Sequence, residues 1–237
     1  MEGLIAGPAA QSAERIPWGC GGAGHKPLLI AHGVNSRRRA WWAAGRGFDG
    51  VEVDVAINSH GELVACHVGE EEAAACASGC GRCPRGVRLS WLLDALPRRM
   101  LLLLDCKAPG VASRAASLAL SMGFNPVYVA SRNHAEVSRL AVGAGALASL
   151  DSRLVGLADY LDRIGVDGVT IRAIYVDADV VAELHGRGLL VAVWVVDDAR
   201  VAREAAGMGV DMIITNRPDV LGGAGRKRLR LRFPLLP

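Results

Sequence analysis

Short apolar runs alternate with longer stretches of mixed polarity along most of the chain. The apolar runs are almost uninterrupted, as expected of strands that are covered on both faces in a parallel sheet. The stretches between them have the length and amphipathic spacing of helices, and several end in Gly, which suits the left-handed residue after a helix. The predicted strands are LLIAHGV, GVEVDVA, ELVACHV, MLLLLDCK, PVYVAS, ALASLD, DGVTIRA, LLVAVWVV and DMIITN.

Repeated strand-then-helix units in a chain of 237 residues predict one TIM (β/α)8 barrel as a single domain. The run ELVACHV is predicted to lie beside the second strand as a hairpin partner or extension, and a cysteine-bearing loop follows it. An open doubly wound sheet is the alternative, but no Gly-rich fingerprint follows the first strand. We expect an N-terminal arm at residues 1–26, the barrel at 27–222, and a basic, then apolar tail at 223–237.

Polar residues occur near many strand ends, and the active sites of TIM barrels lie at the C-terminal ends of the strands. Glu52 and Asp54 are two residues apart in one strand, so their side chains face the same side. Adjacent carboxylates repel each other, and a hard divalent cation such as Mg²⁺ or Ca²⁺ relieves the repulsion. The other polar residues predicted at the mouth of the barrel are His32, His67, Asp105, Lys107, Trp194 and Asn216.

Asp105 and Lys107 repeat the two-residue spacing after four consecutive leucines. At such a mouth, Asp105 is predicted to be a third oxygen ligand, and Lys107 to offer a positive charge to a phosphoryl oxygen. His32 and His67 indicate proton transfer beside a metal-bound anion. The structural alternatives are solvent-facing acids, a simple ion pair between Asp105 and Lys107, and a core position for Trp194.

Five strings in order, AHGVN, VEVDV, ACHVG, LLDCK and GVDMIITNRPDVL, resemble the glycerophosphodiester phosphodiesterase superfamily. Within it they are most similar to the sphingomyelinase D and phospholipase D branch known from spider venoms. His32 is followed by Gly-Val-Asn rather than Arg-Gly, the Pro-Glu-Asn-Thr segment is missing, and Asn216 stands where ordinary members usually carry Asp. The resemblance runs from about Leu28 to Leu221.

This resemblance implies an enzyme that depends on Mg²⁺ (or Ca²⁺) and cleaves the head-group phosphodiester of glycerophosphodiesters or lysophospholipids. The product would be a cyclic phosphate or a hydrolysed monoester. A toxin role is not expected, because the chain shows no secretion signal and its cysteine spacing differs. The implied site has Glu52, Asp54 and Asp105 for the metal, His32 and His67 as acid and base, Lys107 and Asn216 to steady the phosphate and histidine geometry, and Trp194 to wall the head-group pocket.

Cys76, Cys80 and Cys83 have the spacing that radical S-adenosylmethionine enzymes use for a [4Fe–4S] cluster. Here, however, the motif follows the second strand rather than the first, and no aromatic residue precedes the last cysteine. The alternatives are a structural zinc, with His60 or Cys66 as a further ligand, a loop disulfide, or free thiols.

A net charge of only +3 argues against a general polyanion binder, so the predicted partner is a small-molecule substrate and not nucleic acid. No apolar run is long enough to span a bilayer, and the N-terminus lacks the features of a signal peptide, so the expected location is cytoplasmic. The tail GRKRLRLRFPLLP is either a solvated or barrel-packed terminus or a peripheral contact to an anionic membrane. The alternative from a different functional class is a barrel that binds phosphorylated or lipid ligands without turnover.

Overall fold

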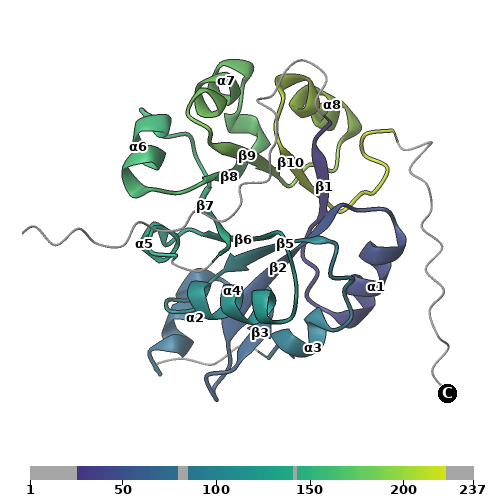
Figure 1. Ribbon diagram of the computed structural model, residues 1–237, viewed down its shortest axis with the longest axis vertical. Helices are drawn as coiled ribbons and strands as arrows, with labels where there is room; N and C mark the ends of the chain where they lie inside the picture. Colours follow the sequence, from purple (N-terminus) through teal and green to yellow (C-terminus); the bar gives the residue numbers. More distant parts are fainter. Residues whose placement is uncertain (1–25, 80–84, 141–142, 223–237) are drawn as a thin grey trace, which may run out of the picture.

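The computed structural model describes residues 26–79, 85–140 and 143–222. Within these ranges, eight parallel strands form a barrel with the helices arranged around it (Figure 1). The sheet closes because the first strand pairs in parallel with both the second and the last. The predicted TIM barrel is therefore confirmed, and the open-sheet alternative is wrong.

The barrel strands alternate with helices, as the sequence pattern predicts. The strands are β1 (Leu28–Ala31), β2 (Gly50–Ile57), β5 (Leu101–Cys106), β6 (Val127–Ser131), β7 (Gly145–Leu150), β8 (Gly168–Arg172), β9 (Leu190–Trp194) and β10 (Met212–Thr215). The helices are α1 (Arg37–Gly45), α2 (Glu70–Ala77), α3 (Leu89–Leu93), α4 (Ala112–Ser121), α5 (His134–Val137), α6 (Leu157–Ile164), α7 (Ala178–Gly186) and α8 (Ala199–Met208), with a 3-10 turn η1 (Ala173–Tyr175) before α7.

Two short strands extend β2 outside the barrel. β3 (Leu63–Ala65) pairs antiparallel with β2, and β4 (Val87–Arg88) pairs antiparallel with β3. This is the hairpin partner predicted from ELVACHV. It carries the chain back past the mouth of the barrel, so that the residues just after β3 lie beside the end of β2.

The segment expected as a cysteine-bearing loop contains a helix. α2 begins with three consecutive glutamates, which suit the positive end of a helix dipole. Cys76 lies on this helix and is disulfide-bonded, which favours the disulfide alternative over a metal or cluster at that thiol. Cys66 is a free thiol, and Cys80 and Cys83 lie outside the described residues.

The inside of the barrel is a packed apolar core. Gly145 leaves room for the ring of Tyr128, because a Cβ atom at this glycine would collide with that ring. A larger core fills the space between the strands and the helices. Residues whose side chains form the inner core include Ile30, Leu101, Leu103, Tyr128, Leu147, Ala192, Met212 and Ile214.

Three aspartates at the N-terminal end of the barrel, Asp49, Asp167 and Asp211, share one arrangement and are called here the N-terminal aspartates. Each comes directly before a strand, and its carboxylate accepts a backbone N–H from the neighbouring strand. The donors are Leu29, Ala146 and Val191, at distances of 2.8, 2.8 and 2.7 Å. These bonds join β1 to β2, β7 to β8 and β9 to β10 at their starts.

The predicted arm and tail lie outside the described residues, except for Lys26. Among the helices of the described ranges, none is long and apolar enough to cross a membrane.

Candidate active site

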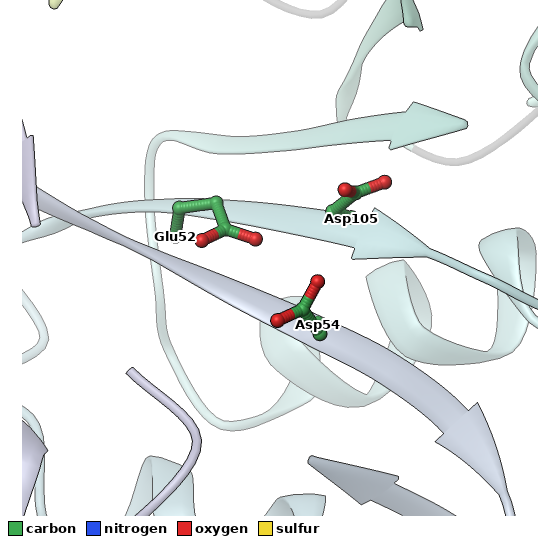
Figure 2. A group of neighbouring side chains, drawn as sticks. All are labelled: Glu52, Asp54 and Asp105. Atoms are coloured by element: carbon green, nitrogen blue, oxygen red, sulfur yellow. The ribbon is translucent and has the colours of Figure 1, made fainter. Parts of the chain in front are cut away.

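Three acidic side chains from two neighbouring strands lie close together toward the C-terminal end of the barrel (Figure 2). Glu52 and Asp54 lie on β2 and Asp105 on β5, and the strand register places Asp54 directly beside Asp105. One carboxylate oxygen from each residue lies within 4.8 Å of the other two. We call these residues the carboxylate cluster. The grouping predicted from the two-residue spacing is therefore present.

Burial makes this cluster electrostatically unfavourable by itself. Burial raises the pKa of Glu52 well above its usual value, and the charges of Asp54 and Asp105 raise it further. Burial likewise raises the pKa of Asp105. A divalent cation would relieve this repulsion, and three carboxylates are the donor type that Mg²⁺ and Ca²⁺ prefer. The residues present therefore fit such a metal.

Lys107 supplies a positive charge beside the cluster. Its Nζ lies 3.0 Å from Oδ1 of Asp54 and 2.5 Å from Oδ2 of Asp105. Burial would lower the pKa of Lys107, but the two aspartates raise it above its usual value, so the ammonium group stays charged. The ion pair considered as a structural alternative thus coexists with the carboxylate cluster.

His67 and Asn35 both contact Asp54 from loops. The Nδ1 atom of His67 lies 3.1 Å from Oδ2 of Asp54. Asn35 donates to the same oxygen at 2.7 Å and accepts the backbone N–H of Asp54 at 3.0 Å. Burial would raise the pKa of Asp54, but the charge of Lys107 and these hydrogen bonds lower it, so this carboxylate is ionised. Asn35 was not identified as a site residue from the sequence, although it lies in the AHGVN string.

His32 directly follows β1 and is held through its backbone. Its N–H donates to the carbonyl of Thr215 at 3.0 Å. The next residue, Gly33, has a φ of +62° and donates its N–H to Oε2 of Glu52 at 2.6 Å. The left-handed conformation at Gly33 favours glycine at this turn. The turn therefore joins the His32 loop to the carboxylate cluster.

Asn216 has hydrogen-bond partners on both atoms of its amide. Its Oδ1 accepts from Arg39 at 2.7 Å, and its Nδ2 donates to Asp197 at 2.8 Å. Arg39 also donates to the carbonyl of His32 at 3.2 Å. Burial would raise the pKa of Asp197, but hydrogen bonds from Asn216 and Thr215 lower it. Asn216 therefore contacts the His32 loop through Arg39, and sequence reasoning missed both Arg39 and Asp197.

The opposite half of the mouth carries Trp194 and three further polar residues. Trp194 ends β9 and packs on the inner core, and its buried Nε1 has no hydrogen-bond partner among the described residues. Arg132 and Asp151 continue the two-residue alternation of the inner-core residues of β6 and β7. Arg172 lies two residues beyond the buried Thr170, on the other face of β8 from Val169 and Ile171, which belong to the outer core. Counting in steps of two along these strands would have identified all three from the sequence.

Arg132 joins three elements across this side of the mouth. It pairs with Glu70, at the start of α2, at 3.1 Å, and with Asp151, just after β7, at 2.6 Å. Burial raises the pKa of Glu70, and the charge of Arg132 opposes that shift. The segment that follows His67 is thereby attached to the ends of β6 and β7.

The structure thus gathers most of the predicted residues into one site. The carboxylate cluster, Lys107 and His67 are in direct contact, whereas His32 and Asn216 are linked to them through Gly33 and Arg39. Trp194 lies across the mouth on the inner face. The catalytic and binding roles assigned to these residues remain predictions.

A closed barrel whose mouth combines buried carboxylates, a charged lysine and a histidine has the form of an enzyme that acts on an anionic substrate. Residues 101–220 match the glycerophosphoryl diester phosphodiesterase family, and the chain belongs to this family. The family is one of phosphodiesterases, so the predicted superfamily and enzyme class are confirmed. A comparison with curated proteins finds no significant match.

Solved structures of glycerophosphodiesterases have the same fold. A phosphodiesterase from Oleispira antarctica, in complex with the product sn-glycerol-3-phosphate, is 17% identical with a TM-score of 0.66, covering 81% of this chain and 94% of its own. The glycerophosphodiester phosphodiesterase of Parabacteroides distasonis is 20% identical (TM-score 0.64; 82% and 94% covered). That of Thermotoga maritima is 16% identical (TM-score 0.63; 83% and 97% covered).

Proposed function

We propose that this protein cleaves the head-group phosphodiester of glycerophosphodiesters or lysophospholipids with the help of a divalent cation, Mg²⁺ or Ca²⁺. One observation carries the proposal. Lys107, inside the family-matched segment, contacts both Asp105 of that segment and Asp54, which lies outside it and also contacts His67. Residues from inside and from before the family-matched segment therefore meet in one site.

The carboxylate cluster would hold the cation, which when bound would neutralise charge on the non-bridging oxygens of the phosphate. Lys107 orients Asp54 and Asp105 and adds a fixed positive charge next to the site. The contact of His67 Nδ1 with Asp54 leaves Nε2 as the ring nitrogen that can donate or accept a proton. The imidazole is largely exposed, so a substrate can reach it.

His32 is proposed to act as the second proton-transfer group, with His67 as its counterpart. Its loop is fixed by the Gly33 contact to Glu52 and by Arg39, which donates to its carbonyl. Asn216 and Asp197 brace Arg39 from the other side, so these residues are proposed to position His32. Trp194 is proposed to wall the head-group pocket across the mouth.

The decisive experiment is ³¹P NMR of the protein with Mg²⁺ and a panel of glycerophosphodiesters and lysophospholipids, with EDTA controls. An EDTA-sensitive cyclic phosphate would place the enzyme with the phospholipase D branch, and a monoester would make it a diesterase that completes hydrolysis. Loss of every reaction would instead favour a barrel that binds phosphorylated or lipid ligands without turnover.

The two histidines are tested by His32→Ala and His67→Ala. We expect each substitution to lower turnover by about 10²–10⁴-fold, the usual contribution of a general acid or base. Circular dichroism and thermal unfolding should stay unchanged, because neither imidazole is part of the core. Wild-type activity in either variant would remove that histidine from the mechanism.

A further inference from the structure

Arg172 differs from the other arginines in the half of the mouth that carries Trp194, where the head group is proposed to lie. Arg132 is neutralised by Glu70 and Asp151, and Arg153 is paired with Asp177 at 2.7 Å. Arg172 is exposed, and among the described residues it has no carboxylate partner. Among the described residues, the guanidinium of Arg172 is therefore not held by a direct ion pair and can bind an anion.

The position of Arg172 is defined by the register of β8 and β9. Its Cα is paired with that of Trp194, and it lies two residues beyond the buried Thr170. Its side chain therefore starts from the inner face of the barrel, next to the indole. β8 is the fourth strand from β2 in either direction round the closed sheet, so Arg172 stands across the mouth from Asp54.

A substrate whose phosphate lies at the carboxylate cluster would extend its leaving group across the mouth toward Trp194 and Arg172. A cationic head group there would be repelled by the guanidinium. Asp197 is a nearby carboxylate that could offset the repulsion, but it already accepts hydrogen bonds from Thr215 and from the backbone and side chain of Asn216. The hydrogen bonds that Asp197 already accepts hold it to Thr215 and Asn216, so the guanidinium of Arg172, unpaired among the described residues, favours an anionic head group at this place.

We infer that Arg172 is a specificity residue that selects substrates whose head-group alcohol carries its own negative charge, a carboxylate or a phosphate. A guanidinium pairs with both anions through two parallel hydrogen bonds, and the flat indole of Trp194 beside it limits the space for the head group. This inference rests on the proposed function, because it assigns the leaving-group side of the same site.

The test uses two pairs of soluble substrates that each differ by a single anionic group. Glycerophosphoserine and glycerophosphoethanolamine differ by a carboxylate, and glycerophosphoinositol 4-phosphate and glycerophosphoinositol differ by a phosphate. We expect wild-type kcat/KM to favour the anionic member of at least one pair by about tenfold, as for one charge-assisted contact. The pair that responds identifies the anion.

The substitution Arg172→Gln should reduce this preference to about one, whereas Arg163→Gln, on the exposed side of α6, should keep the wild-type ratio. A wild-type enzyme that favours neither anionic substrate, or an Arg172→Gln variant with an unchanged ratio, would overturn the inference while leaving the phosphodiesterase proposal intact. Absence of turnover of all four compounds would overturn this inference, and if lysophospholipids are not cleaved either, the proposed function is overturned with it.

Discussion

The two ends of the barrel use the same chemical group in opposite ways. At the N-terminal end, each of the N-terminal aspartates stands apart from the others and accepts a backbone N–H from a neighbouring strand. At the C-terminal end, the carboxylate cluster brings three acids within 4.8 Å of one another. Each N-terminal aspartate thus has a hydrogen-bond donor for its carboxylate, whereas the acids of the carboxylate cluster repel one another.

The comparison separates acids that stabilise the folded state from acids that destabilise it when no cation is bound. A carboxylate that accepts a backbone N–H stabilises the folded state, and its loss leaves a buried donor without a partner. A buried group of like charges is stable only when a cation or protons compensate it, and such perturbed groups are concentrated at functional sites. The N-terminal aspartates should therefore affect stability, and the carboxylate cluster should affect activity.

The largest expected effect is the loss of activity in Glu52→Gln. The amide can still accept the N–H of Gly33, but it is a poor ligand for a hard cation. We expect Mg²⁺-dependent turnover to fall by about 100-fold or more. In EDTA, the melting temperature should be unchanged or higher, because the repulsion with the two neighbouring aspartates is removed. Glu71→Gln, an exposed acid on α2, is the matched control.

Asp211→Ala should show the opposite behaviour. The carboxylate of Asp211 accepts the N–H of Val191 at 2.7 Å and contacts Nε2 of His185 at 2.9 Å. Its removal leaves both groups without this partner, so the free energy of unfolding should fall by about 3 kcal/mol. Turnover at saturating Mg²⁺ and at a temperature where the variant is folded should stay within about twofold of wild type.

The conservative variant Asp211→Asn sharpens this test, because its side-chain oxygen can still accept the N–H of Val191. Denaturant unfolding should show a loss of only about 1 kcal/mol for this variant. A strong loss of activity in either Asp211 variant while the protein is folded would contradict the division between the two ends.

Metal binding should appear as a stability effect at the C-terminal end. Mg²⁺ at about one hundred times its dissociation constant should stabilise the wild type by about 2.7 kcal/mol, which raises the melting temperature by roughly 5–10 °C. The shift should be lost in Glu52→Gln and kept in Asp167→Ala, which changes an N-terminal aspartate. An equal shift in both variants, measured by calorimetry with and without EDTA, would mean that Mg²⁺ binds elsewhere.

The smallest expected effect concerns Arg132, which attaches the segment after His67 to the mouth. Arg132→Ala should release Glu70 and lower kcat by about two- to fivefold, since partly exposed ion pairs contribute little energy. Hydrogen exchange should accelerate across α2. Arg153→Ala, which breaks a comparable pair with Asp177, should not change exchange in α2. Unchanged exchange in the Arg132 variant would rule out this attachment.

The sequence by itself determined the barrel and the candidate metal ligands. Strand formation and the face that a side chain takes depend on neighbours in the chain, so alternation predicted that Glu52 and Asp54 would point together. The rule that barrel sites lie at strand ends then extended the site to Asp105, Lys107 and Asn216. The same alternation would have reached Arg132 and Arg172 if it had been applied to every strand.

Only the tertiary structure decided which partners these residues have. Asp54 touches His67, Asn35 and Lys107 because a hairpin, a loop and the next barrel strand converge on it. Such contacts depend on barrel closure and on the register between strands far apart in the sequence, which no local pattern encodes. For the same reason, the contrast between the N-terminal aspartates and the carboxylate cluster depends on the closed barrel and could not be predicted from the sequence.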